Sequence, residues 1–85
     1  MNCINEQQLK DYERNGFVGT AKIEGKGGLF TLIITVKGRP TDEITICTQR
    51  KTPREWQSLD RMINHYRLIM PSLTHYHLYF SEPIP

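Results

Sequence analysis

The sequence has little of what marks membrane or secreted proteins. Its longest apolar stretch, LFTLIITV at positions 29–36, is far shorter than the ~18–20 residues that a membrane-spanning helix needs. The first residues, MNCINEQQ, contain no apolar segment of the kind found in a secretory signal. We therefore expect a soluble, cytoplasmic protein with no membrane partner.

Cysteine is also scarce. The two that occur, Cys3 and Cys47, lie far apart and show neither a disulfide framework nor the C-x-x-C spacing of a zinc site. Cysteines in such ordinary contexts are usually buried thiols, so we expect both to be reduced. His75 and His77, two residues apart, could share one metal, and His65 lies on the preceding helix. A third ligand from Cys47 or Asp60 is conceivable, but no standard spacing supports it. We expect surface histidines, no metal and no cofactor.

Signatures of catalysis are missing as well. The sequence contains no G-x-S-x-G, no phosphate-binding P-loop and no paired-carboxylate signature. Cys47 with His75 or His77 is the one combination of a nucleophile and a base that the sequence readily offers. Cys47 falls within a predicted strand, where a thiol of low pKa is uncommon. We therefore predict that the protein is not an enzyme.

Neither sign of charge dominates. Eleven Lys and Arg against nine Asp and Glu leave a net charge of +2, which neither requires nor excludes a nucleic-acid partner. A chain of 85 residues forms one small domain, which we assign to residues 1–85. The tail SEPIP, residues 81–85, is expected to fray.

The sequence does contain an ordered series of secondary-structure signals. INEQQLKDYERNG (4–16) predicts a helix with Asn5 as its N-cap, Gln8 completing a capping box, and Asn15-Gly16 as its end. Three strands joined by the turns GKGG and GRPTD indicate an antiparallel meander; they are predicted over residues 17–24, 29–37 and 43–49. The middle strand is apolar on both faces, which predicts that it is covered on two sides or paired across an interface.

A second helix is predicted to begin at TPRE. Thr52 would be its N-cap, Pro53 its first residue, and Glu55 the acid that closes a capping box. An apolar stripe at helical spacing follows and Pro71 ends the helix; the stripe consists of Trp56, Leu59, Ile63, Tyr66 and Met70. The alternating segment 74–80 predicts a final strand.

These signals predict a small α+β domain with the order α-β-β-β-α-β. We expect an antiparallel meander with both helices on one face of the sheet, and a final strand after the second helix. Because that strand follows a helical crossover, it should run parallel to its neighbour.

Basic residues gather around the predicted start of the second helix. Arg50, Lys51 and Arg54 surround it, and Lys37 and Arg39 would come from the preceding turn. Because a helix N-terminus suits phosphate, these residues are predicted to bind nucleic acid or an acidic protein surface. The alternative is that the capping box already satisfies the free amides and that the cations are merely solvated.

The aromatic final strand suggests a second contact surface. If its outer edge is unpaired, it could pair with a partner protein or with a second copy of the chain, forming a homodimer. The alternative is that Pro83 and Pro85 block this edge.

The stretch TQRKTPREWQSLD resembles the strand-to-helix junction of small plasmid-encoded partition-associated (ParC-like) proteins, T-x-R-x-x-P-R-x-[FW]-x-[ST]-L-D. The matching positions are Thr48, Arg50, Pro53, Arg54, Trp56, Ser58, Leu59 and Asp60. This resemblance implies an accessory protein of a mobile genetic element. Small proteins of such elements include inhibitors of host defence, such as anti-CRISPR proteins, which bind a protein partner.

The order helix, three strands, helix also resembles the double-stranded-RNA-binding domain. That family binds phosphates from the start of its second helix, but its K-K-x-A-K signature is replaced here by RKTPRE, and the final strand is additional. We therefore predict a non-enzymatic accessory protein of a mobile element that binds a macromolecule through the basic helix start. An inhibitor of host defence and a duplex-binding module are the alternatives.

Overall fold

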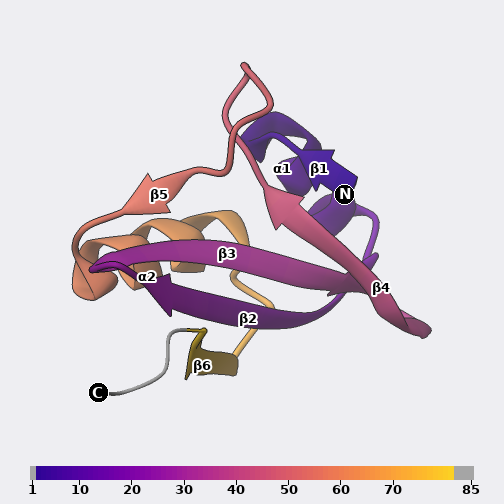
Figure 1. Ribbon diagram of the computed structural model, residues 1–85. Helices are drawn as coiled ribbons and strands as arrows, with labels where there is room; N and C mark the ends of the chain where they lie inside the picture. Colours follow the sequence, from indigo (N-terminus) through magenta and orange to yellow (C-terminus); the bar gives the residue numbers. More distant parts are fainter. Residues whose placement is uncertain (1, 82–85) are drawn as a thin grey trace.

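The computed structural model describes residues 2–81, which form one sheet and two helices (Figure 1). The helices are α1 (Glu6–Arg14) and α2 (Leu59–Ile69). The strands are β1 (Asn2–Ile4), β2 (Val18–Lys26), β3 (Leu29–Val36), β4 (Arg39–Ile46), β5 (Glu55–Trp56) and β6 (Tyr76–Phe80). Neither helix is long and apolar enough to cross a bilayer. The predicted fraying of the tail falls, apart from Ser81, outside the described residues.

The sheet has the order β1-β4-β3-β2-β6, and β5 pairs with β3 as well. The predicted meander is confirmed: β2, β3 and β4 are antiparallel neighbours. Its turns are tighter than predicted. Gly27 and Gly28 both have positive φ, 61° and 79°, as a two-residue hairpin turn requires, and Gly38 takes φ 82° in the second turn. The predicted turn GRPTD is therefore mostly strand.

Both helices cover the same face of the sheet (Figure 1). This helix-covered face follows from the alternation of side chains along each strand. Leu9 of α1, together with Met62 and Tyr66 of α2, packs into one core with the inward-facing strand residues. Those strand residues are Ile4, Ala21, Ile23, Leu32, Ile34, Ile44 and Ile46. The α+β class and the predicted arrangement of helices are confirmed.

The last strand runs parallel to its neighbour, as its helical crossover predicts: Ala21 of β2 is opposite Tyr76 of β6. The first strand was not predicted. Asn2–Ile4 pairs in parallel with β4, where Ile4 lies opposite Ile46. Three residues before a helix cap are too few to show the alternation of a strand in the sequence. They form a strand because the free edge of β4 offers them backbone partners.

The predicted start of the second helix is wrong. Pro53 forms a β-bridge with Cys47, and Glu55 and Trp56 pair with Thr31 and Phe30 of β3. The helix begins three residues after Trp56, at Leu59, with Ser58 as its N-cap. This pairing gives hydrogen-bond partners to backbone groups of β3 that would otherwise be unpaired. These hydrogen bonds outweigh the helix start that TPRE favours locally.

The prediction of two free thiols is also wrong, because Cys3 and Cys47 form a disulfide. The backbone brings them together: the N–H of Cys47 donates to the carbonyl of Ile4 at 2.7 Å, which extends the β1–β4 pairing to the end of β4. Two cysteines that look unrelated in the sequence become neighbours, Cys3 on β1 and Cys47 directly after β4, with Cα atoms 5.9 Å apart.

Reduction of this disulfide should destabilise the fold. It closes a loop that spans 44 positions of the chain, and constraining the unfolded state in this way typically contributes ~2–4 kcal/mol. Urea unfolding with and without dithiothreitol should show that loss in the free energy of unfolding. A Cys3→Ser/Cys47→Ser double variant should start at the lower stability and be insensitive to the reductant. Equal unfolding midpoints for the oxidised and reduced protein would contradict the expectation.

Candidate binding groove on the open sheet face

The face of the sheet opposite the helices carries the second set of alternating side chains, and we call it the open face. On β2 these are Lys22, Glu24 and Lys26, and on β3 they are Leu29, Thr31 and Ile33. The register places them in rows across the strands. The central strand β3 is therefore apolar on both faces, as predicted, but the helices cover only one of them.

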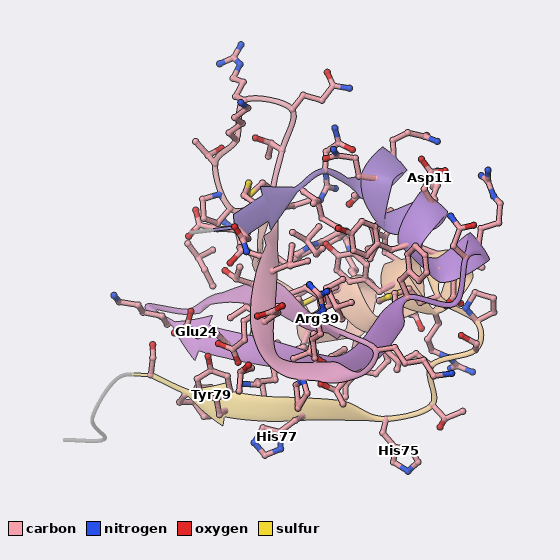
Figure 2. All side chains as sticks on the ribbon, turned by 90° about the vertical axis from the view of Figure 1, so that its right-hand side faces the viewer. Asp11, Glu24, Arg39, His75, His77 and Tyr79 are labelled. Atoms are coloured by element: carbon pink, nitrogen blue, oxygen red, sulfur yellow. A yellow bond between two sulfur atoms is a disulfide. The ribbon has the colours of Figure 1, made fainter. Side chains whose placement is uncertain are left out.

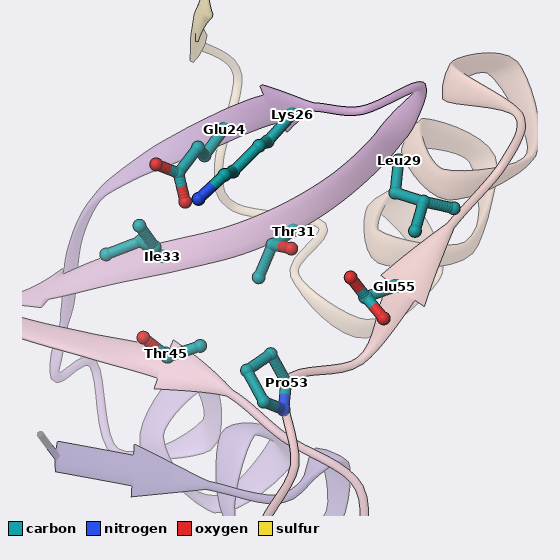
Figure 3. A pocket seen from close by; sticks show the side chains of 8 residues that line it. All are labelled: Glu24, Lys26, Leu29, Thr31, Ile33, Thr45, Pro53 and Glu55. Atoms are coloured by element: carbon teal, nitrogen blue, oxygen red, sulfur yellow. The ribbon is translucent and has the colours of Figure 1, made fainter. Parts of the chain in front are cut away.

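A groove opens on this face where β4 separates from β3. β4 pairs with β3 at Ile33↔Thr45, and β5 rejoins β3 at Thr31↔Glu55. Between these pairs the chain leaves the sheet, so a groove of about 420 Å³ remains beside β3 (Figure 3). Its lining residues are Glu24, Lys26, Leu29, Thr31, Ile33, Thr45, Pro53 and Glu55.

The groove combines an apolar floor with acidic walls. Leu29, Ile33 and Pro53 supply aliphatic surface. Glu24 and Glu55 are both opposite Thr31, one on each neighbouring strand, so two carboxylates flank the same row. Lys26 lies beside Glu24 on β2, so this wall carries one ammonium as well as a carboxylate (Figure 3). Aliphatic surface between carboxylates suits a Lys or Arg side chain, whose stem is apolar and whose tip is cationic.

Beside the groove, the open face is already neutralised. The ammonium of Lys22 donates a hydrogen bond to the carboxylate of Glu43, and this bond raises the pKa of Lys22 above its ordinary value. Tyr79 of β6 lies opposite Glu24, and partial burial raises its pKa. This part of the face balances its own charge, whereas the lining of the groove holds two carboxylates, Glu24 and Glu55, against one ammonium, Lys26.

Arg54, a predicted phosphate ligand, is engaged within the fold. Its Nε lies 3.2 Å from a carboxylate oxygen of Glu6 on α1, and its guanidinium stacks over Trp56 at 4.6 Å from the ring centroid. The same oxygen of Glu6 lies 3.0 Å from Nε2 of His65. Arg54 therefore ties the β5 segment to both helices, and it adds little free positive charge to the surface.

The other predicted cations are split between two ends of β4. Arg50 and Lys51 lie in the exposed loop after β4, at the top of Figure 1, where no carboxylate within residues 2–81 pairs with them. Lys37 lies in the turn before β4 and Arg39 is its first residue, at the opposite end of this eight-residue strand. Arg39 forms an exposed ion pair with Asp42 at 3.7 Å. The structure does not bring the five residues together.

Several side chains of residues 48–60 stabilise the fold. The hydroxyls of Thr48 and Thr52 lie 2.9 Å apart and close the loop, and Ser58 caps α2 through the N–H of Arg61. The indole N–H of Trp56 donates to the hydroxyl of Tyr66 at 3.3 Å. Burial raises the pKa of Tyr66 to about 12, so this hydroxyl stays neutral in the core.

The histidines do not form a metal site in the described part of the chain. His65 packs against Trp56, with ring centroids 5.1 Å apart. His77 projects from the outer strand β6 and His75 directly precedes that strand (Figure 2). Their exposure agrees with the prediction of surface histidines.

Sequence reasoning missed the groove, although one signal pointed toward it. The two apolar faces of the strand predicted over residues 29–37 indicated either a second cover or an interface, and the structure leaves Leu29 and Ile33 uncovered by the helices. The carboxylate walls gave no local signal, because Glu24 and Glu55 lie far apart in the sequence and meet only through the pairing of both β2 and β5 with β3.

Removing the side chain of Arg54 should cost stability, whereas removing that of Arg50 should not. Arg54→Ala loses a partly buried ion pair and a cation–π contact, and we expect a loss of ~1–2 kcal/mol in the free energy of unfolding. Arg50→Ala, with the same change of charge on an exposed loop, should stay within ~0.5 kcal/mol of the parent. Urea unfolding followed by Trp56 fluorescence compares them; equal losses would show that Arg54 has no special structural role.

Comparisons with protein-family models, with curated proteins and with solved structures found no match for this chain. Its function must therefore be inferred from its own residues, and the groove beside β3 is the site that its geometry offers for that inference.

Proposed function

We propose that this is a non-enzymatic accessory protein that acts by binding another protein through the groove on its open face. One observation carries the proposal: the second apolar face of β3 is left open between the carboxylates of Glu24 and Glu55. The partner segment that fits is an exposed Lys or Arg flanked by aliphatic residues. The proposal thus favours a protein partner over the nucleic-acid partner that the basic stretch suggested.

The energetics of the groove suit protein recognition. Fully burying an aliphatic side chain contributes ~1.5–3 kcal/mol, and Leu29 and Ile33 are only partly buried, so a fraction of that gain is still available to a partner. Carboxylates at the rim add selectivity and steer a cationic partner, since rim charges act more on association than on final affinity. The same carboxylates would repel the phosphates of a nucleic acid.

The biological setting rests on other grounds. A role in a mobile genetic element, either partition-associated or as an inhibitor of host defence, is supported by the resemblance of residues 48–60 to ParC-like proteins. The cytoplasmic location stays a prediction from the sequence. The Cys3–Cys47 disulfide argues against that location, because disulfides persist mainly in oxidising compartments.

Charge reversal in the groove tests the proposal. Tagged parent protein and the Glu24→Lys variant are used to capture partners from a host lysate, and each partner lost by the variant is purified for calorimetric titration. We expect Glu24→Lys to weaken binding at least tenfold, because it places a cation against the cationic segment of the partner. Asp11→Lys makes the same change of charge on α1 (Figure 2) and should bind like the parent.

The contact itself is mapped by amide chemical shifts of the labelled protein during titration with the purified partner. Shifts centred on Thr31, Ile33 and Glu55 are expected. Capture of the same partners by the parent and by Glu24→Lys, or shifts centred elsewhere, would overturn the assignment of the groove.

A nucleic-acid-binding role remains the second candidate, because Arg50 and Lys51 are exposed and unpaired by carboxylates within residues 2–81. If it holds, fluorescence anisotropy with labelled duplex DNA, duplex RNA and single strands will show affinity that falls steeply with salt. An Arg50→Ala/Lys51→Ala variant should then lose that binding. Glu24→Lys should keep it, which separates this role from the groove. Absence of binding at low salt would exclude it.

A further inference from the structure

The two edges of the sheet are protected to different degrees. At one end lies β1, which is three residues long, and short edge strands offer little template for pairing. At the other end lies β6, whose five residues YHLYF include no Asp, Glu, Lys or Arg. Within residues 2–81, β6 pairs with β2 on one side and its other side is free. Natural edges are commonly guarded by charges or bulges, and β6 has neither.

The side chains of β6 leave apolar surface beside this edge. Tyr76, Leu78 and Phe80 alternate onto the helix-covered face, but the helices protect only the beginning of the strand. Leu78 is 40% exposed and Phe80 62% exposed. At the Tyr76 end, a groove of about 330 Å³ separates β6 from α2, lined by Ile63, Arg67, Leu73, Thr74 and Tyr76. One end of β6 thus presents an exposed ring, and the other end presents a recess.

The free backbone groups of β6 can be identified from one hydrogen bond. The N–H of Ser81 donates to the carbonyl of Gly25 on β2 at 3.2 Å. Backbone N–H and C=O groups of successive residues point to opposite sides of a strand, so His77 and Tyr79 also direct theirs toward β2. It follows that Tyr76, Leu78 and Phe80 direct theirs outward, away from the sheet.

We propose that β6 pairs with β6 of a second copy, antiparallel and centred on Leu78. In this register Leu78 lies opposite Leu78 of the second copy, and each Tyr76 lies opposite the other copy's Phe80. All three outward-facing residues then exchange backbone hydrogen bonds with their counterparts, and none is left unpaired. The arrangement has two-fold symmetry, in which each surface binds its own copy.

The side chains are complementary in the same register. The two Leu78 side chains meet on the helix-covered face, and each Phe80, whose ring packs over Gly25 of its own β2, lies opposite Tyr76 and its recess in the other copy. Tyr76 is only half-buried there, although its hydroxyl is enclosed without a hydrogen-bond partner in the described structure. On the open face, His77 of one copy lies opposite Tyr79 of the other. No like charges oppose one another within the paired strands.

A second copy is favoured over a different protein because the strand is complementary to itself. Its exposed ring and its recess lie at opposite ends, so a two-fold axis through Leu78 matches each with the other. The pairing also joins the two sheets edge to edge. Their open faces then become continuous, and the Glu24–Glu55 grooves of both copies lie on the same side of the dimer.

The test is light scattering after size-exclusion chromatography over a series of concentrations, with circular dichroism to confirm folding. The parent should be a dimer. Leu78→Lys and Leu78→Asp should each weaken dimerisation at least tenfold, because each places like charges opposite one another at the two-fold axis. Mixing the two variants should restore a dimer, now heterodimeric, which also shows that both are folded. Leu68→Lys, at a leucine that is 84% exposed on α2, is the matched control and should dimerise like the parent.

The register is tested separately by oxidation of a Leu78→Cys variant. Directly opposed residues of a hydrogen-bonded antiparallel pair have Cα atoms ~5.5 Å apart, which is within the range of a disulfide. We expect a covalent dimer, and none from Leu68→Cys. A parent that is monomeric at every concentration would overturn the proposal. So would dimers that persist in both charged Leu78 variants, or the absence of a crosslink in a Leu78→Cys dimer.

Discussion

The outer edge of β3 is shared by two segments, and this sharing organises most of the molecule. β4 takes the half that ends in Val36, and β5 takes Phe30 and Thr31. Between them the chain must leave the sheet and return, which produces the exposed loop, the bridge between Cys47 and Pro53 and the groove on the open face. Unpaired backbone groups along a central strand are costly. The two residues of β5 remove that cost at Phe30 and Thr31, which holds the chain against β3.

Contacts with both helices hold the segment from Arg54 to Trp56 against the sheet. Arg54 reaches Glu6 of α1, His65 of α2 shares the same carboxylate, and Trp56 bonds to Tyr66 in the core. A cation that appears in the sequence as part of a basic cluster is therefore a structural residue. The surface charge that remains is modest, and the feature with the most distinctive chemistry is the groove, where apolar surface and carboxylates lie together.

Much of the fold could be predicted because it depends on local signals. The Asn5 capping box, the left-handed Gly16 and the glycines between β2 and β3 act within a few residues, and each was found where expected. The parallel final strand followed from its helical crossover. The start of α2 could not be predicted in the same way. TPRE satisfies every local rule for a helix start, yet the edge of β3 offers these residues a better set of hydrogen bonds.

The sequence by itself determined the class of fold, the meander, the two helices on one face and the double apolar character of β3. These follow from periodicity and from turn chemistry, which are properties of neighbouring residues. Tertiary structure alone decided that Cys3 meets Cys47, that Arg54 is neutralised by Glu6, and that Glu24 and Glu55 flank one row of the sheet. Each of these pairs is far apart in the sequence and is joined by strand pairing or helix packing, and no local pattern encodes which distant segments will become neighbours.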